Sequence, residues 1–306
     1  MKNKKIIIGS RGSKLALIYA ERARKSIIEC NPGLDSNLLD IKSIVTTGDK
    51  YQNKRLSDIG GKGHFSKKIE EQLLTKEIDL AVHALKDMPS IETPGLSLNV
   101  FLKRNDPREI LISKKNLSFD NLKTGSVIGT SSFRRSAQIK KLRNDLEVKL
   151  IRGNVDTRIK KLEEKKYDGI ILALTGIQSL GVKKKISQIF STREMLPSVG
   201  QGIVVLQTRT NDYKIIDLIN KTNHYKTFLC ATAERSMLKI LEGDCDTAVG
   251  ALATVEGNLI SMQCELFSLD GKKRFFTEIN GSSMEPKNIG INAGKELIKQ
   301  AGNSYK

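Results

Sequence analysis

Short apolar segments alternate with amphipathic helical segments through the first two thirds of this chain, and this alternation constrains the fold more than any other feature. Lys5–Gly9, Ile41–Thr46 and Ile78–His83 have the length and apolar character of buried strands, whereas Lys14–Cys30 and Lys67–Leu74 carry apolar residues at helical spacing. A strand, a helix and a strand in succession are typical of a βαβ unit. We therefore predict a parallel α/β sheet in this part of the chain.

A second α/β segment begins near Ser126 and repeats this order. Its expected strands and helices are Val127–Thr130, Ser136–Arg143, Glu147–Leu150, Val155–Lys165 and Gly169–Ala173. After about residue 222 we expect a helix, three strands and a closing helix: Phe228–Leu241, Val249–Val255, Leu259–Leu266, Arg274–Ile279 and Ile289–Gln300. The fold class is therefore α/β, with two α/β domains and a smaller C-terminal α+β domain.

The size and charge of the chain narrow its function. With 306 residues it is too long for one ordinary core. The net charge of +18 implies acidic partners: nucleic acid, an anionic membrane surface or a small polyanionic substrate. No apolar run approaches the ~20 residues of a membrane-spanning helix, and the N-terminal segment does not match a signal peptide. Four dispersed cysteines without a CxxC pair indicate neither a disulfide framework nor a zinc site, so we expect a cytoplasmic protein that binds anions.

The two α/β segments resemble each other at their first strand-to-helix turns, IIIGSRGSKLALI and VIGTSSFRRSAQI. Each turn has a glycine, a cluster of hydroxyl residues and nearby arginine, namely Arg11 in the first and Arg134 with Arg135 in the second. Capped helix N-termini with arginine form sites for carboxylate or phosphate. One such turn would be an ordinary helix cap, but two favour a cleft that binds a multiply charged anion from both sides.

Two further motifs place charged residues at strand ends. AVHALKDMPS puts Lys86 and Asp87 just beyond a buried strand, where ligands bind in parallel α/β sheets. A carboxylate there can stabilise a developing cation or move a proton, and the lysine can bind a substrate carboxylate. A solvated helix-start pair is the alternative, which Pro89 disfavours by ending the segment. In LIRGNVDTR, Arg152 and Arg158 follow another strand and can form bidentate contacts with carboxylates.

Other candidate features are less specific. The polar, glycine-rich segment at residues 47–64 is typical of a mobile loop, either a lid or a disordered surface insertion. The histidines at 64, 83 and 224 show no metal-ligand spacing, and we expect His83 to end a buried strand in a structural role. Cys245 lies in the turn-like stretch LEGDCDTAVG; a lone cysteine is usually inert, but an exposed position on such a loop favours reactivity.

Eight segments, in order over nearly the whole chain, resemble the porphobilinogen deaminase family. They are IGSRGSKLAL, TTGD…GGKGHF, AVHALKDMPS, RNDPRE, IGTSSFRRSAQ, IRGNVDTR, LPSVGQG and LEGDCDTAVGA. The resemblance implies two domains like periplasmic binding proteins, at residues 1–102 with 203–221 and at 103–202, and a third at 222–306 that carries a cysteine. It also implies that the first domain closes through a returning segment near residues 201–218.

The resemblance further implies a reaction of tetrapyrrole biosynthesis and a set of site residues. Four porphobilinogens condense head to tail with loss of ammonia, and hydroxymethylbilane is then released by hydrolysis. The cofactor is a dipyrromethane, joined by a thioether to the cysteine that matches Cys245. Asp87 matches the catalytic aspartate, and Phe65 an aromatic residue near the pyrroles. The positions that match binding residues for substrate and cofactor are Arg11, Ser13, Lys86, Thr130, Ser131, Ser132, Arg134, Arg135, Arg152, Arg158 and Gln201.

The sequence departs from the family pattern at Ser179, where an arginine is common, at His64, where an apolar residue is usual, and in the DCDTAVG loop. Two other classes of function remain open from the residues alone. A nucleic-acid-binding protein would account for the net charge, although no aromatic-interleaved basic strand or known module is present. A non-catalytic two-domain anion-binding protein would account for the paired turns. The resemblance favours a monomeric enzyme that acts on a small molecule, without metal, nucleic acid or membrane as a partner.

Overall fold

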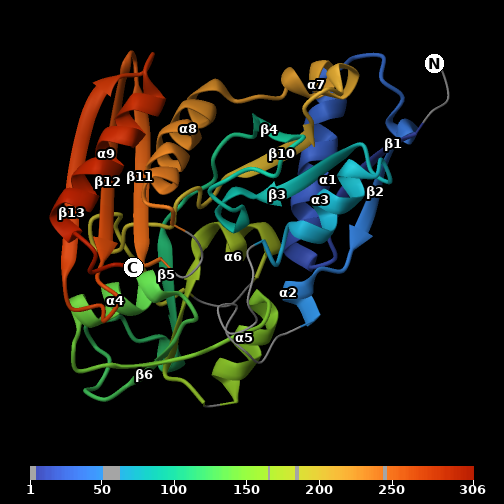
Figure 1. Cartoon of the computed structure of the whole chain (residues 1–306). Helices are drawn as coiled ribbons and strands as arrows, with labels where there is room; N and C mark the ends of the chain where they lie inside the picture. The colour runs from blue at the N-terminus through green and yellow to red at the C-terminus, as the bar shows by residue number, and fades with distance from the viewer. Residues whose placement is uncertain (1–4, 51–62, 165, 183–185, 244–246) are drawn as a thin grey trace.

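A computed structural model of the chain describes residues 5–50, 63–164, 166–182, 186–243 and 247–306. Its strands form three separate sheets, with orders β2-β1-β3-β10-β4, β7-β6-β8-β5-β9 and β11-β12-β13. Figure 1 shows these sheets with their helices as three lobes, the third on the left beside α8 and α9. The mixed α/β class with a smaller C-terminal unit is thereby confirmed.

The first sheet has helices on both faces. Its strands are β1 (Ile6–Arg11), β2 (Leu39–Ile44), β3 (Leu80–Ala84), β4 (Leu96–Phe101) and β10 (Val204–Arg209). Its helices are α1 (Lys14–Cys30), α2 (Thr47–Lys50), α3 (Lys67–Leu74) and α7 (Tyr213–Asn220). One apolar core joins α1 and α7 to the sheet, and a second core, around Ile69 and Leu73, joins α3 to the other face. Both faces are therefore buried, which explains why the strands are apolar throughout.

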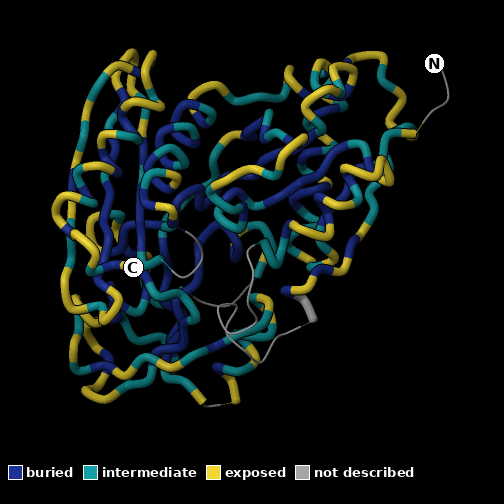
Figure 2. Tube along the Cα trace, viewed as in Figure 1, coloured by how far each residue is buried: buried dark blue, intermediate teal, exposed yellow. Residues whose placement is uncertain are grey.

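The second sheet is built in the same way. Its strands are β5 (Glu109–Ser113), β6 (Val127–Gly129), β7 (Glu147–Lys149), β8 (Gly169–Ala173) and β9 (Gln188–Ile189). Helix α4 (Phe133–Leu142) packs on one face through Ile139, and α5 (Val155–Glu163) and α6 (Leu174–Leu180) pack on the other through Leu162 and Ile177. Figure 2 shows buried backbone along the strands of the sheets and exposed backbone around the periphery.

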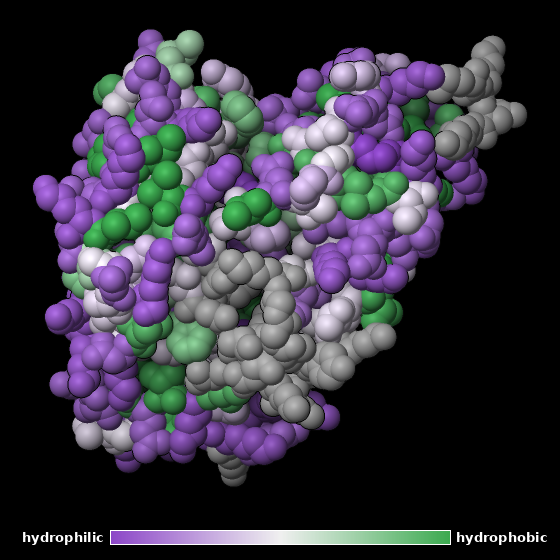
Figure 3. Space-filling view, in the orientation of Figure 1, coloured by the Kyte–Doolittle hydropathy of each residue, from purple (hydrophilic) through white to green (hydrophobic). Residues whose placement is uncertain are grey.

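The third sheet is antiparallel and consists of β11 (Val249–Glu256), β12 (Leu259–Phe267) and β13 (Arg274–Ser282). Helices α8 (Tyr225–Ile240) and α9 (Pro286–Ala301) share one core with it. On the face seen in Figure 3, hydrophilic residues predominate around smaller apolar areas. Among the described residues, no helix is both long and apolar enough to cross a membrane.

Two crossing segments connect the first and second sheets, and the third unit holds both of them. Leu102 N donates to Val204 O at 3.0 Å, and Asn105 N donates to Gly202 O at 2.8 Å. The buried carboxylate of Glu234, on α8, accepts hydrogen bonds from Arg104 Nη1 at 2.5 Å and from the amide of Gly200 at 2.7 Å. Because one carboxylate binds both crossings, the third unit fixes the place where the two α/β units meet.

The predicted parallel pairing is confirmed for β1 with β2 and β3 and for β6 with β7 and β8, but both sheets also contain antiparallel pairs that the sequence pattern did not indicate. Strand β10 runs antiparallel to β3 and β4, and β5 runs antiparallel to β8 and β9. Both exceptions are strands that enter a sheet from a crossing segment, without a preceding helix to carry the chain back to the opposite edge. Strand β10 belongs to the segment at 201–218 that the resemblance expected to return to the first unit.

The helix predicted to begin at Ser136 begins at Phe133 instead. The hydroxyl of Ser132 accepts the N–H of Arg135 at 3.4 Å and so caps the helix three residues earlier than the apolar pattern suggested. As a consequence, Arg134 and Arg135 lie in the first turn of α4, next to the end of β6.

Candidate anion-binding cleft

A cavity of about 360 Å³ lies between the first and second sheets. Its wall includes all but one of the described candidate residues: Arg11, Ser13, Phe65, Lys86, Asp87, Ser131, Ser132, Arg134, Arg135, Arg152, Arg158 and Gln201. Seven lysine and arginine side chains face it, against two aspartates, Asp87 and Asp156. A space of this size and charge suits a small molecule with several carboxylates.

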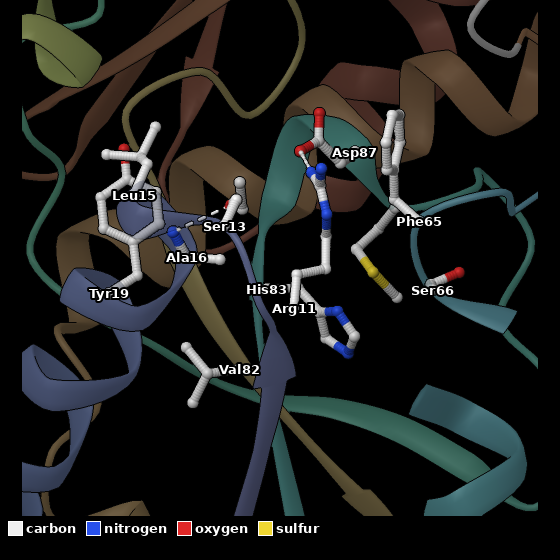
Figure 4. A pocket seen from close by; sticks show the side chains of 12 residues that line it. Arg11, Ser13, Leu15, Ala16, Tyr19, Phe65, Ser66, Val82, His83 and Asp87 are labelled. Atoms are coloured by element: carbon white, nitrogen blue, oxygen red, sulfur yellow. Dashed lines mark hydrogen bonds and ion pairs between the residues drawn. The ribbon is translucent and has the colours of Figure 1, made fainter. Parts of the chain in front are cut away.

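On the first-sheet side, β1 ends at Arg11 and the next helix begins after the Ser13 cap, whose hydroxyl accepts the amide of Ala16 at 3.3 Å. The Arg11 guanidinium lies 4.0 Å from the ring centre of Phe65, and its Nη1 lies 3.9 Å from Asp87 Oδ2. Figure 4 shows the Arg11 side chain reaching Asp87 with Phe65 beside it. The 3.9 Å separation is longer than a hydrogen bond, so the carboxylate keeps room for another partner.

The short 3-10 turn Leu85–Asp87, directly after β3, presents Lys86 and Asp87 to the cavity. Lys86 Nζ donates to Gln201 Oε1 at 3.3 Å, and Gln201 Nε2 donates to the carbonyl of Pro107 at 2.6 Å. Burial lowers the pKa of Lys86 to about 8 despite the nearby Asp87. Gln201, which is fully buried, thus holds an ammonium at the site rather than facing a ligand alone.

On the second-sheet side, two arginines share one buried carboxylate. Arg134 Nη2 lies 2.6 Å from Glu109 Oε1, and Arg135 binds the same carboxylate through Nε at 3.0 Å and Nη2 at 2.8 Å. Glu109, at the start of β5, is fully buried. Burial opposes its ionisation, but Arg135 and Arg134 outweigh that effect and lower its pKa to about 2. The cluster therefore carries a net positive charge at neutral pH.

Part of each guanidinium in this cluster is still available. Arg134 Nη1 also donates to Gln138 Oε1 and to the Leu196 carbonyl, and Arg135 Nη1 donates to the Ile171 carbonyl. Together with the contacts to Glu109, these hydrogen bonds use three of the five N–H donors of each arginine. Both side chains line the cavity, so they combine a fixed position with donors for a bound carboxylate.

Arg152 and Arg158 extend this basic wall. Arg158 Nε donates to the Gly153 carbonyl at 2.9 Å, in the turn that leads into α5. Burial and the neighbouring Arg135 and Arg152 lower the pKa of Arg158 to about 10. Several cations are thus held close together against their mutual repulsion, and a bound anion would relieve that repulsion.

One of the described candidate residues does not line the cavity. Thr130 is buried, and its hydroxyl accepts the amide of Ser132 at 3.2 Å within the turn. Cys245 lies outside the residues that the structure describes, as does most of the loop predicted at 47–64, where Thr47–Lys50 forms α2. Ser179 also lies off the cavity wall, near Tyr19.

Sequence reasoning missed Glu109 and Tyr19. Glu109 precedes the buried apolar run ILIS, and an acidic residue at such a position needs a cationic partner, which was the available signal. Tyr19, on α1, lines the cavity near Thr175 and Ser179 on α6. The sequence did not indicate a functional role for Tyr19, because a tyrosine at an apolar position of an amphipathic helix is usually part of the core.

Comparisons with known proteins relate the chain to one family. Residues 6–217 match the family described as "Porphobilinogen deaminase, dipyromethane cofactor binding domain", and residues 228–299 match "Porphobilinogen deaminase, C-terminal domain". A porphobilinogen deaminase of Syntrophomonas wolfei is 41% identical over 295 residues, covering 96% of this chain and 95% of that protein. One from Staphylococcus epidermidis is 40% identical, covering 97% and 96%.

Among solved structures, the BvgS VFT2 domain of Bordetella pertussis, as the F375E/Q461E double mutant, aligns with a TM-score of 0.43 and 13% identity, covering 72% of this chain and 85% of that one. The probable amino-acid transporter binding protein YtmK of Bacillus subtilis aligns with a TM-score of 0.41 and 12% identity, covering 72% and 90%. Likenesses this distant do not bear on function.

Proposed function

The chain belongs to the porphobilinogen deaminase family, and we propose that its cleft performs the family reaction with Asp87 as the catalytic carboxylate and Cys245 as the attachment point of the dipyrromethane. That reaction is the head-to-tail condensation of four porphobilinogens with loss of ammonia, followed by hydrolytic release of hydroxymethylbilane. The observation that carries the assignment of Asp87 is its position: it is one of two carboxylates on a wall with seven cations, at the carboxyl end of β3.

The residues of the cleft fit a dipyrromethane, because its acetate and propionate groups require several fixed cations. Arg135, Arg152 and Arg158 would hold such carboxylates from the second-sheet side, and Arg11 and Lys86 from the first-sheet side. The hydroxyls of Ser13, Ser131 and Ser132 add hydrogen-bond donors along the same wall. When bound, the cofactor supplies a covalent primer on which the chain of pyrroles grows.

Asp87 would act on the porphobilinogen that enters the cleft. Loss of ammonia leaves a cationic methylene-pyrrole, and a fixed carboxylate lowers the energy of that cation. The same carboxylate accepts hydrogen bonds from pyrrole N–H groups and can take up a proton. Arg11 Nη1, at 3.9 Å from Asp87 Oδ2, and the neighbouring buried Lys86 place positive charge beside this carboxylate.

The environment of two other cysteines supports Cys245 as the attachment point. Cys230 and Cys264 are buried in the core of the third unit. Burial raises the pKa of Cys230 to about 12 and that of Cys264 still further, so both thiols stay protonated and inaccessible. Strand β11, the next strand after Cys245 in the sequence, begins close to the cleft: a β-carbon added at Gly250 would lie 3.2 Å from Arg134 Cδ.

The test is the intact mass of the purified protein. We expect a mass above that of the chain by one dipyrromethane, with Cys245→Ser at the chain mass and the matched control Cys30→Ser still carrying the adduct. Peptide mapping should place the adduct on Cys245. An adduct on another cysteine would overturn the attachment point. A chain that carries none and does not consume porphobilinogen would overturn the proposed function as a whole.

We also propose the wider organisation of the protein. The domain boundaries are residues 1–102 with 203–221, 103–202 and 222–306, because each range contains one of the three sheets. The protein acts as a cytoplasmic monomer on porphobilinogen, and its positive charge serves that polyanionic chemistry rather than nucleic acid. The five arginines on the wall of the cleft, Arg11, Arg134, Arg135, Arg152 and Arg158, support this proposal.

A further inference from the structure

A second, smaller pocket adjoins the main cavity beneath Arg11 and Asp87. Its volume is about 50 Å³, and its lining includes Arg11, Phe65, Ser66, His83 and Asp87 (Figure 4). One bound water needs ~10–15 Å³, whereas typical ligand pockets begin at ~300 Å³. The pocket is therefore the size of a water site and is too small for a pyrrole ring.

His83 belongs to a buried chain of hydrogen bonds under this pocket. Gln207 Nε2 donates to Glu70 Oε1 at 2.8 Å, and Ser66 Oγ donates to Glu70 Oε2 at 3.2 Å. Gln207 Oε1 lies 3.1 Å from His83 Nε2. His83, Gln207 and Glu70 are all buried, at 7%, 0% and 5% exposure. The chain runs from α3 through β10 to β3.

These hydrogen bonds determine which nitrogen of His83 carries the proton. The carboxylate of Glu70 can only accept, so the amide nitrogen of Gln207 must face it and the amide oxygen must face His83. His83 Nε2 must then be the N–H donor. Burial lowers the pKa of His83, which keeps the ring neutral and leaves Nδ1 with a free lone pair. Among the described residues, no hydrogen-bond partner of Nδ1 is seen, and the residue lines the pocket.

We propose that the side pocket binds a water that donates a hydrogen bond to His83 Nδ1 and links it to Asp87, and that His83 positions this water to carry away the proton displaced in each condensation. This inference rests on the proposed function. In a condensation, the carbon–nitrogen bond breaks with its electrons on the departing ammonia, and the attacking pyrrole forms the new carbon–carbon bond. Its α-hydrogen leaves as a proton, which Asp87 accepts and passes through the water to Nδ1. The proton returns by the same route to the departing ammonia or to solvent, so the balance is one ammonium ion per condensation.

The groups around His83 are suited to a transient charge. Glu70 on α3 and Asp87 after β3 favour the imidazolium, Gln207 on β10 accepts from Nε2 in both protonation states, and Arg11 at the end of β1 opposes the charge. Burial also opposes it, so the resting ring is neutral. A buried base with one lone pair free for a water, and with Gln207 and then the Glu70 carboxylate behind its other nitrogen, can therefore accept a proton briefly and return it.

The first experiment determines the tautomer by NMR of the whole protein labelled with ¹⁵N-histidine. The chain has three histidines, so His83 can be assigned by its loss in His83→Gln. We expect a neutral Nε2–H tautomer at pH 7. A protonated Nδ1 in the neutral ring, or a charged ring at pH 7, would overturn the proposal. This measurement does not depend on catalysis, so it stays informative even if the proposed function fails.

The second experiment compares matched variants at His83. Asn can place an acceptor near the position of Nδ1, whereas Gln can keep a donor toward Gln207 but leaves the pocket without the acceptor. We expect His83→Gln to lower kcat on the order of ten- to hundredfold, below the full effect of a direct general base. His83→Asn should retain more activity, and both should keep the covalent adduct and the melting temperature. Wild-type kcat in a folded His83→Gln variant would overturn the proposal.

A variant at Gln207 separates a proton-handling role from a structural one. In Gln207→Glu, a carboxylate would face Nε2 and raise the pKa of His83. The ring would then be charged, and unable to accept a proton, at higher pH than in the wild type. The acid limb of the kcat profile should move to higher pH, with the substrate KM little changed. An unmoved limb in a variant whose NMR shows the raised His83 pKa would contradict the proposal.

Discussion

The two halves of the cleft use the same local design with different degrees of restraint. In both, a strand ends in a turn, a serine caps the next helix, and arginine lies next to the cap. On the first-sheet side, Arg11 approaches Asp87 only to 3.9 Å, and both side chains are partly exposed. On the second-sheet side, Arg134 and Arg135 are held by the buried Glu109 at 2.6–3.0 Å.

The difference indicates a division of labour. Groups that change their interactions during a reaction must keep unoccupied donors and acceptors, as Asp87 does among the residues that the structure describes. Groups that only bind charge can be fixed beforehand, which reduces the cost of organising them around a ligand. The first-sheet side is therefore expected to supply the chemistry, and the second-sheet side a rigid receptor for carboxylates.

The largest expected effect, on the free energy of unfolding, comes from removing the charge of Glu109 on the second-sheet side. Glu109→Gln would leave Arg134 and Arg135 buried together without a compensating charge, and losing one partner of such a group costs about 3–5 kcal/mol. Urea unfolding measures this loss. Glu147→Gln, at an exposed ion pair with Lys149, is the control and should change stability by less than about 1 kcal/mol. Equal effects at the two sites would show that Glu109 does not organise the arginines.

The next largest effect should come from Asp87, on the first-sheet side, and should concern the rate of condensation rather than the stability of the fold. Asp87→Asn keeps the size of the side chain but removes the charge that opposes the cation. We expect condensation to slow roughly 10²–10³-fold or more, as when one key electrostatic group is removed. Single-turnover mass spectrometry of enzyme–substrate adducts measures this rate, and a thermal melt checks the fold. Asp156→Asn, also on the cavity wall, should be much milder.

Asp87→Glu sharpens the same test, because it keeps the charge in a displaced position. It should therefore retain more activity than Asp87→Asn. A near wild-type rate in the folded Asn variant would remove Asp87 from the chemistry and with it the proposed division between the two sides.

The strand-end charges of the cleft could be predicted from the sequence because they follow from local rules. Hydroxyl residues and arginine after an apolar strand specify a capped turn at a sheet edge, and Arg11 and Arg135 lie at such turns. Thr130 shows the limit of this argument: three adjacent hydroxyl residues look equivalent in sequence, but only Ser131 and Ser132 reach the cavity.

Strand direction and long-range pairing could not be predicted in this way. A fully buried strand such as β10 or β5 has the same apolar pattern whether it runs parallel or antiparallel, so its direction depends on where the crossing segments deliver it. Glu109 and Arg135 are 26 positions apart, and their contact arises only when β5 lies next to β8, under the first turn of α4. The returning strand β10 was expected only through the family resemblance.

A smaller effect should appear in the pH dependence of substrate capture. The folded pKa of Lys86, about 8, is below its ordinary value of 10.5, so the side chain loses its charge as pH rises through 8. If Lys86 binds a substrate carboxylate, kcat/KM should fall above pH 8, by at most about tenfold per pH unit. Lys86→Arg should remove this limb.

The lowered pKa of Lys86 also predicts a pH dependence of stability. Burying the charged lysine destabilises the fold below pH 8, so the free energy of unfolding should rise between pH 8 and 10.5 relative to Lys86→Met.

The smallest expected effect compares the two caps directly. Ser13→Ala and Ser132→Ala each remove one cap hydrogen bond, to Ala16 or to Arg135, and each should cost about 1 kcal/mol of stability. Their effects on activity should differ. After loss of the Ser132 cap, Glu109 still holds Arg135 by two contacts, so KM for porphobilinogen should change little. After loss of the Ser13 cap, Arg11 should lose its position next to Asp87, which it approaches only to 3.9 Å, and kcat should fall more than in Ser132→Ala. If both variants lost the same stability and the same kcat, the two sides would be equally restrained in solution. That result would contradict the contrast between the Arg11–Asp87 separation of 3.9 Å and the 2.6–3.0 Å contacts of Arg134 and Arg135 with Glu109.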